Sequence, residues 1–222
     1  MLKSLLVLAA QSVAILAAPA PAEDGPVAIS SRQWGGGGYA FSDWHEGNIQ
    51  YSCQNGDGGS YTVNWSGTGG FVCGKGWSPG GERTVNYEGT YTPTGPGYLC
   101  LYGWTRNPLI EYYVVDAHGD LAPNEPWTEK GTFDSDGGTY TVYESTRVNQ
   151  PSIVGTATFQ QYWSVRTEQR VGGQITTGNH FRAWQGFGMG LGQQDYMILA
   201  TEGYTNSQTG EGSSGSSSIN VW

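Results

Sequence analysis

Two glutamates lie inside apolar, aromatic-rich segments that are otherwise typical of β-strands. Glu111 lies in the run NPLIEYYVVD and Glu202 in the run ILATEGY. An ionised carboxylate is costly to remove from water unless something compensates its charge, so this placement indicates a chemical role. Side chains two positions apart in a strand share a face, which places Glu111 with Tyr113 and Glu202 with Tyr204. Two acids beside tyrosines fit acid–base chemistry on a sugar, whose ring can stack on aromatic side chains.

The composition predicts a single all-β domain. The chain has 222 residues, which is enough for one well-buried core and too few for two domains of ordinary size. It contains 36 Gly, 14 Tyr and 9 Trp, and only 13% of its residues are charged, which favours strands and turns over helix. The net charge of -9 argues against nucleic acid or an anionic membrane as a partner, whereas a neutral polymer is compatible with it.

The N-terminal residues are typical of a secretory signal. One Lys is followed by an apolar stretch and then by small residues, in the sequence MLKSLLVLAAQSVAILAAPAPA. We expect residues 1–18 to be a signal peptide, residues 19–33 a short pro-segment or disordered arm, and residues 34–222 the folded domain. The mature protein is therefore expected to be extracellular.

Short alternating runs recur between turn signals along the rest of the chain, which predicts a large antiparallel β-sandwich. One segment changes period, because Phe181, Trp184 and Phe187 have helical spacing. We expect one short helix there, packed on the sheet, with Asn179 as its N-cap. The serine-rich tail before Ile219 has few apolar residues, so it is expected to be a long hairpin loop that leads into a final strand.

Three cysteines, Cys53, Cys73 and Cys100, allow at most one internal disulfide. By alternation, Cys73 falls on the core face of its strand and Cys100 on the cleft face, so these two are not expected to pair. The pairing is otherwise open. Cys and His residues do not cluster in the sequence, so neither a metal site nor a cofactor is predicted. The sequon NWS at Asn64 is a candidate glycosylation site.

Several longer motifs carry a resemblance to a known family. They are NPLIEYYVVD, STRVNQPSI, TFQQYWSVR, NHFRAW and ATEGY, in this order and spacing. Together they resemble the glycoside hydrolase family 11 endo-1,4-β-xylanases, over about residues 44–222. The resemblance implies an antiparallel β-sandwich jelly roll with a deep substrate cleft, one short helix and a mobile thumb hairpin. It also implies that the partners are xylan and xylo-oligosaccharides, and we expect a monomer.

The same resemblance assigns roles to single residues. Glu111 matches the nucleophile, and Glu202 the general acid/base, of a retaining double displacement. Tyr102 resembles the tyrosine near the nucleophile, and Tyr113 the one that helps to hold substrate and nucleophile. Trp44 resembles the tryptophan that stacks a xylose ring on the glycone side. The other candidate substrate-binding residues are the polar Arg147 and Gln161, the thumb-tip residues Pro151, Ser152 and Ile153, and the tyrosines Tyr196 and Tyr204.

The chain departs from the family pattern at three places. The residue before the FVCGKGW run is usually Asn or Asp in the family and contacts the acid/base, but here it is Gly70. A glycine supplies no side-chain hydrogen bond, so the family's relation between this position and pH optimum does not transfer. The loop HGDLAPNEPW and the insertion NSQTGEG after Tyr204 also differ, and we expect them to alter the ends of the cleft or the preferred substrate length.

Two alternatives to a xylanase are kept open. In the first, the chain is a non-catalytic carbohydrate-binding jelly roll that uses the same cleft. The intact set of Glu111, Glu202, Tyr102 and Tyr113 favours the enzyme. In the second, the substrate is a glucan, because glucose differs from xylose only by a hydroxymethyl group, and the family resemblance alone favours xylan.

Overall fold

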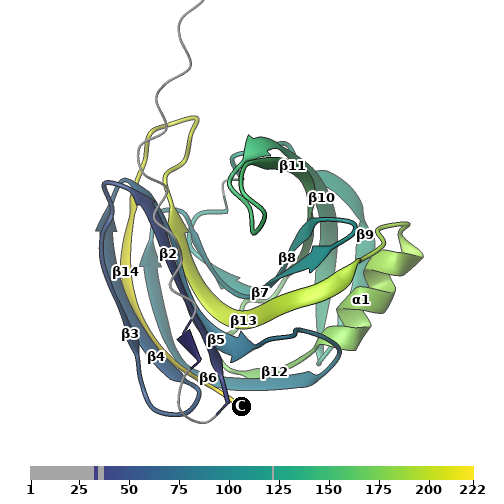
Figure 1. Ribbon diagram of the computed structural model, residues 1–222, viewed down its shortest axis with the longest axis horizontal. Helices are drawn as coiled ribbons and strands as arrows, with labels where there is room; N and C mark the ends of the chain where they lie inside the picture. The colour runs from purple at the N-terminus through teal and green to yellow at the C-terminus, as the bar shows by residue number, and fades with distance from the viewer. Residues whose placement is uncertain (1–32, 35–37, 122) are drawn as a thin grey trace, which may run out of the picture.

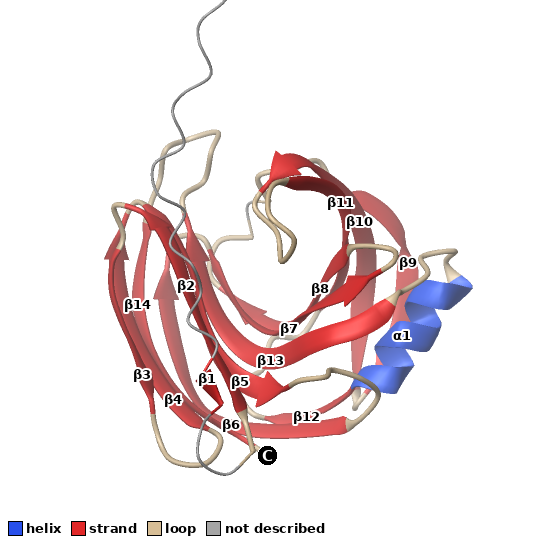
Figure 2. Ribbon diagram, viewed as in Figure 1, coloured by secondary structure: helices blue, strands red, loops and turns tan. Residues whose placement is uncertain are grey.

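The computed structural model describes residues 33–34, 38–121 and 123–222, which form two β-sheets and one helix (Figures 1 and 2). The all-β jelly roll expected from the sequence is confirmed. Residues 1–32, which hold the predicted signal peptide and nearly all of the predicted arm, lie outside the described residues. No helix in the described part of the chain is long and apolar enough to cross a membrane.

The larger sheet curls strongly around its concave face (Figure 1). Its strand order is β1-β2-β5-β13-β7-β8-β11-β10-β9. Neighbouring strands are antiparallel except β8 and β11, which are parallel. The strands are β1 (Gln33–Trp34), β2 (Ala40–Gly47), β5 (Gly69–Trp77), β7 (Gly97–Arg106), β8 (Ile110–His118), β9 (Thr128–Ser135), β10 (Gly138–Gln150), β11 (Ala157–Arg166) and β13 (Gln193–Tyr204).

The smaller sheet covers the convex side of the larger one. Its strand order is β12-β6-β14-β4-β3. The strands are β3 (Gln50–Asn55), β4 (Ser60–Gly67), β6 (Thr84–Thr94), β12 (Gly173–Thr176) and β14 (Ser213–Val221). Asn64, the candidate glycosylation residue, lies in β4 and is exposed.

Alternation along the strands separates the hydrophobic core between the sheets from the floor of the concave face. Leu99 and Leu101 of β7 belong to the core between the sheets, whereas Cys100, between them, packs with the aromatic residues of the concave face. Cys53 and Cys73 form a disulfide that links β3 to β5 and so joins the two sheets. Cys100 is a free thiol on the face that alternation predicted, but it is fully buried beneath the cleft floor and does not line the cleft.

The helix α1 (Thr177–Gly186) packs on the sandwich near β9, with Trp184 fully buried (Figure 2). The predicted N-cap was wrong, because Thr176 is the N-cap and Asn179 lies inside the first turn. Strand β12 runs directly into the helix, which moves the start toward the N-terminus. Asn179 instead donates from Nδ2 to Ser135 Oγ, 3.0 Å away.

The serine-rich tail is a strand rather than a loop from Ser213 onward, so that part of the sequence prediction was wrong. Strand β14 lies between β4 and β6 and pairs with both along its length. Its inward-facing Ser217 accepts a hydrogen bond from Thr201 Oγ1 at 2.8 Å. Backbone pairing on two sides and small side chains that fit close to β13 replace the apolar pattern that usually marks a buried strand.

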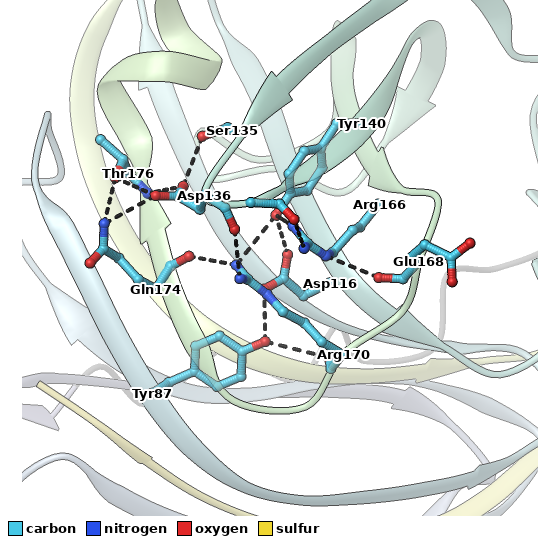
Figure 3. A network of polar contacts seen from close by, with 11 residues as sticks. Tyr87, Asp116, Ser135, Asp136, Tyr140, Arg166, Glu168, Arg170, Gln174 and Thr176 are labelled. Carbon is cyan, nitrogen blue, oxygen red and sulfur yellow. Dashed lines mark hydrogen bonds and ion pairs between the residues drawn. The ribbon is translucent and has the colours of Figure 1, made fainter.

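A polar network fills the region where the end of β8 meets β6, β10 and the 167–172 loop (Figure 3). At its centre is the carboxylate of Asp116, which is 1% exposed. The carboxylate accepts hydrogen bonds from Tyr87 at 2.8 Å and Tyr140 at 2.6 Å, and it pairs with Arg170 Nε at 2.8 Å. Because Tyr87 belongs to the smaller sheet and Tyr140 to the larger one, Asp116 connects the two sheets.

Candidate active site

A cleft of about 550 Å³ lies on the concave face of the larger sheet. Its walls are formed by β2, β5, β7, β8, β10, β11 and β13 and by the loops at their ends. All of the candidate site residues from the sequence line it, namely Trp44, Gly70, Tyr102, Glu111, Tyr113, Arg147, Pro151, Ser152, Ile153, Gln161, Tyr196, Glu202 and Tyr204.

Glu111, on β8, is held by hydrogen bonds at both carboxylate oxygens. Tyr102 Oη donates to Oε1 at 2.7 Å, and Gln161 Nε2 donates to Oε2 at 2.7 Å. Tyr102 comes from the antiparallel neighbour β7 and Gln161 from the parallel neighbour β11, opposite Glu111 in register. The side chain is 8% exposed, so the carboxylate has exchanged water for these fixed donors.

A second layer of hydrogen bonds fixes the donors themselves. Trp104 Nε1 donates to Tyr102 Oη at 2.6 Å, and Ser145 Oγ donates to Gln161 Oε1 at 3.0 Å. Because the amide oxygen of Gln161 accepts from Ser145, its amide nitrogen is directed to Glu111. The position of Glu111 is therefore determined by side chains from three neighbouring strands, β7, β10 and β11.

Glu202, on β13, has different surroundings. Its Oε2 atom is inaccessible to solvent and accepts no hydrogen bond from the described protein groups. Its neighbours in register are Val72 on β5 and Tyr98 on β7, one apolar and one aromatic. An unpaired carboxylate oxygen in such a place favours the protonated carboxyl group, which carries no charge to desolvate.

The two carboxyl groups differ in pKa for these reasons. Burial raises the pKa of Glu202 well above its usual value, the negative charge of Glu111 raises it further, and Arg147 opposes both. Burial also raises the pKa of Glu111, but the hydrogen bonds from Gln161, Tyr102 and Tyr113 and the charge of Arg147 lower it. Both pKa values are raised, that of Glu202 more strongly, which favours the protonated form of Glu202 and the ionised form of Glu111.

The thumb is the turn between β10 and β11, which folds back toward the inside of the curled sheet (Figure 2). Pro151, Ser152 and Ile153 lie at its tip and reach the cleft. The turn is closed by Ser152, which donates from Oγ to the Gly155 carbonyl at 2.5 Å and accepts from the Val154 N–H at 3.1 Å. These bonds hold the short turn together as a unit.

Four glutamates and one arginine are the charged groups among the described residues that line the cleft. Arg147, on β10, pairs with Glu125 at 3.0 Å, and its charge also lowers the pKa of Glu46, Glu111 and Glu202. The cleft is therefore acidic overall. Within the described residues, no group of three or more His, Cys, Asp or Glu side chains is arranged to hold a metal ion.

Several cleft residues were missed by the sequence analysis. Alternation could have found Phe159 and Trp163, because they share the face of Gln161 on β11. Trp163 stacks on Tyr113 with ring centroids 3.8 Å apart, so it supports the cleft wall beside Glu111. The loop residues Asn124 and Trp127 have no periodic signal and could not be found in that way.

Gly70 has no side chain, and the space beside it in the cleft lining is not filled by its neighbours. It faces Glu46 on β2 and Tyr204 on β13 in register. A Cβ atom placed on Gly70 would lie 3.7 Å from Glu46 Oε1 and 3.7 Å from the Trp44 ring, which is ordinary contact. A Cβ atom at this position would therefore be accepted without a shift of its neighbours.

Two glutamates of unequal pKa in an aromatic-lined cleft are the arrangement typical of glycoside hydrolases. The comparisons agree, because the sequence profile of Glycosyl hydrolases family 11 matches residues 36–219. The chain belongs to this family.

Individual relatives cover most of the chain. Ethylene-inducing xylanase 1 of Botryotinia fuckeliana is 55% identical over 185 residues, which are 83% of this chain and 63% of that protein. Endo-1,4-β-xylanase 2 of Humicola insolens is 48% identical over 215 residues, which are 93% of this chain and 94% of that protein. A solved endo-1,4-β-xylanase structure from Trichoderma reesei superposes with a TM-score of 0.75 at 42% identity, over 82% of this chain and 97% of that one.

Proposed function

We propose that the protein is a secreted endo-1,4-β-xylanase that cleaves internal bonds of xylan with retention of anomeric configuration. The observation that carries the proposal is the difference in hydrogen bonding between the two glutamates. Glu111 accepts two hydrogen bonds of 2.7 Å, as a carboxylate nucleophile must, while Glu202 Oε2 is buried and unpartnered, as a proton donor requires.

In the first step, Glu111 attacks the anomeric carbon of the sugar on the glycone side. The bond from that carbon to the glycosidic oxygen breaks, and Glu202 transfers its proton to the departing oxygen. The product is a glycosyl ester on Glu111. Direct attack requires the two carboxyl groups to be about 5–5.5 Å apart, with no room for a water molecule between nucleophile and sugar.

In the second step, water attacks the same carbon from the side that the leaving group vacated. Glu202 takes a proton from this water, and the ester bond to Glu111 breaks. Glu202 can act as base at this stage because esterification removes the negative charge of Glu111, which had raised the pKa of Glu202. Two inversions at one carbon give net retention.

The substrate assignment is supported by the relatives, which are named endo-1,4-β-xylanases. The cleft fits a polysaccharide in general terms, because Trp44, Tyr102 and Tyr196 supply apolar surfaces and Gln161 and Arg147 supply polar groups. The thumb tip would cover the bound chain and help to exclude water from the reacting bond.

Secretion and domain limits are part of the proposal. We propose that residues 1–18 direct export, that residues 19–33 precede the folded domain, and that the monomeric enzyme comprises residues 34–222. The Cys53–Cys73 disulfide supports this, because such bonds persist in oxidising compartments. N-terminal sequencing of the secreted protein would test the first limit, and a mature chain that still contains residues 1–18 would contradict it.

The experiment that tests the function is NMR of the purified protein acting on xylohexaose, with the anomeric signals of the first products followed in time. A β-product released first, from internal cuts, is expected. An α-product would mean inversion and would overturn the role of Glu111. Binding without cleavage across a broad pH range would mean that the cleft belongs to a carbohydrate-binding protein.

A further inference from the structure

The two loops in which this chain departs from the family pattern are hydrogen-bonded to each other. One is the segment 123–127 before β9, and the other is the 205–212 loop between β13 and β14, which extends beyond the strand ends (Figure 1). Asn124 joins them by donating from Nδ2 to the Thr205 carbonyl at 3.1 Å and by accepting the Ser207 N–H at Oδ1, 2.8 Å away. The amide nitrogen and the amide oxygen of one side chain therefore connect two loops, across sequence separations of 81 and 83 positions.

The 205–212 loop is a folded support for Asn124. Thr205 Oγ1 accepts the Gly69 N–H at 2.6 Å, which attaches the loop to the start of β5. Asn206 closes the loop on itself, because its Oδ1 accepts the Gln208 N–H at 2.9 Å and its N–H donates to the Glu211 carbonyl at 2.8 Å. The loop therefore presents to Asn124 two backbone groups in fixed positions, the Thr205 carbonyl and the Ser207 N–H.

The opposite side of the 123–127 segment faces the cleft, where Pro123, Asn124, Glu125 and Trp127 all contribute to the lining. Trp127 packs against Trp163, with ring centroids 4.8 Å apart, and Trp163 stacks on Tyr113 beside the nucleophile. The aromatic surface of the catalytic centre therefore continues without a break onto the loop.

Glu125 connects the same segment to β10, the strand that leads into the thumb. Its Oε1 pairs with Arg147 Nη1 at 3.0 Å, and Arg147 is the cation that acts on Glu111 and Glu202. Both members of the pair are about one quarter to one third exposed, with side-chain values of 24% for Arg147 and 32% for Glu125, so they are within reach of a ligand in the cleft.

We propose that residues 123–127, held in place by Asn124 against the 205–212 loop, form an additional sugar-binding wall at the Tyr204 end of the cleft. A pyranose ring of the polymer would place its apolar face on Trp127 and donate a hydroxyl hydrogen to Glu125. This wall makes the enzyme favour long xylan chains, which reach it, over short oligosaccharides, which do not. The inference rests on the proposed function and adds a positioning role for Asn124.

The test compares kcat/KM for xylohexaose and xylotriose in wild type and Asn124→Ala. Loss of both hydrogen bonds releases the segment, so kcat/KM for xylohexaose is expected to fall about fivefold, while the value for xylotriose changes by less than about twofold. The bond at which xylohexaose is cut should also shift. Asn124→Asp keeps the acceptor for the Ser207 N–H but loses the donor to Thr205, so it is expected to lie between the two.

Matched variants separate positioning from general damage. Gln208→Ala changes an exposed side chain on the same 205–212 loop and is expected to leave both kcat/KM values unchanged. Replacing residues 205–211 by two glycines removes both partners of Asn124, the Thr205 carbonyl and the Ser207 N–H, so Asn124→Ala in that background should have no further effect. Melting temperatures of all variants, measured alongside, show whether each remains folded at the assay temperature.

Each outcome decides the inference. A fall in kcat/KM of equal size for both substrates, or no fall for either, would overturn it even if the enzyme is a xylanase. If wild type does not cleave xylohexaose, the proposed function fails. The sugar-binding wall can still be tested separately, by calorimetric measurement of the binding of xylohexaose and xylotriose to the same variants. Weaker binding of only the longer ligand in Asn124→Ala would support the wall, and unchanged binding of both would contradict it.

Discussion

Asp116 is a buried acid of the larger sheet and Glu202 a partly buried one, and their surroundings are opposite. Asp116 accepts hydrogen bonds from two tyrosines and pairs with Arg170, all within 2.8 Å (Figure 3). Glu202 has an inaccessible oxygen for which the described protein groups supply no donor. The first arrangement compensates a buried charge, and the second penalises it.

The contrast shows that burial of an acid does not by itself indicate catalysis. A carboxylate with a full set of partners serves the fold, as Asp116 does between the two sheets. A carboxyl group without partners can gain or lose a proton as its neighbours change, and this is what a general acid/base needs. The predictions below are designed to separate these two roles.

The largest effect is expected for Glu111→Gln, which removes the nucleophile and keeps the shape. Turnover of xylohexaose should fall by roughly 10⁴-fold or more, because no covalent intermediate can form. Binding of the oligosaccharide and the melting temperature should be retained. Residual turnover well above the trace that deamidation produces would exclude Glu111 as the nucleophile.

Asp116→Asn should show the reverse pattern. The substitution leaves the mostly buried Arg170 without its counter-charge, so the free energy of unfolding should fall by about 3–5 kcal/mol. Urea unfolding measures this loss, and kcat per folded molecule should stay within about twofold of wild type. A stable but inactive variant would show that Asp116 belongs to the catalytic apparatus. It would contradict the distinction between the structural role of Asp116 and the catalytic role of Glu202.

His180 is another buried titratable side chain, and its burial predicts that the fold loses stability in acid. Both of its ring nitrogens are buried without a hydrogen-bond partner among the described residues, and burial lowers its pKa from 6.5 to about 3, against the opposing charge of Asp136. Between pH 6.5 and 3 the unfolded chain binds a proton that the folded chain does not. This costs about 3 kcal/mol of stability at pH 4.

His180→Phe removes that proton uptake. The measurement is the difference between the unfolding free energies at pH 7 and pH 4, which cancels any change in packing caused by the larger ring. This difference should be smaller in the variant than in wild type by about 3 kcal/mol. Equal differences would mean that His180 is protonated in the folded protein.

Glu202→Gln should inactivate the enzyme and stabilise it. The folded protein raises the pKa of Glu202, so wild type loses stability as the pH rises above the normal value of 4.5, and glutamine does not titrate. At pH 7 the melting temperature should rise by about 2–4 °C, and the gain should vanish below pH 4. A lower melting temperature at pH 7 would place Glu202 with Asp116 as a structural acid.

The smallest effect is expected at Gly70, where an added Cβ atom makes only ordinary contacts. Gly70 lies in the cleft lining two residues along β5 from Val72, the register neighbour of Glu202. Gly70→Asp should move the pH optimum to the acid side if the new carboxyl shares a proton with Glu202, and Gly70→Asn should move it less. The shift is expected to be less than about one pH unit. Identical pH–rate profiles would mean that position 70 is not coupled to Glu202.

Local sequence patterns predicted the features that depend on alternation. The common face of Glu111, Tyr113 and Tyr102 follows from a period of two, and the single helix from its change of period. The final strand was expected, but its serine-rich first part was predicted as a loop, because backbone pairing on both sides stabilises a strand that has no apolar pattern. The N-cap of the helix was misplaced because β12 leads straight into it.

Features that depend on contacts between distant residues could not be predicted in this way. The partner of Cys73 was left open, because only the pairing of whole sheets brings Cys53 near it. Asp116 lies five residues after Glu111 in the same strand, and no local signal shows that Tyr87, Tyr140 and Arg170 surround it. The contact of Asn124 with the 205–212 loop is of the same kind.

The central claim is that Glu202, not Glu111, holds the proton in the free enzyme. It is tested most directly by an NMR titration of the protein with ¹³C-labelled glutamate side chains, with Glu111→Gln and Glu202→Gln used to assign the carboxyl signals. The account predicts that the Glu202 carboxyl titrates at a distinctly higher pH than the Glu111 carboxyl. It also predicts that the pKa of Glu202 falls when Glu111 is neutralised by the Gln substitution. A higher pKa for Glu111 than for Glu202 would contradict the assignment of both roles.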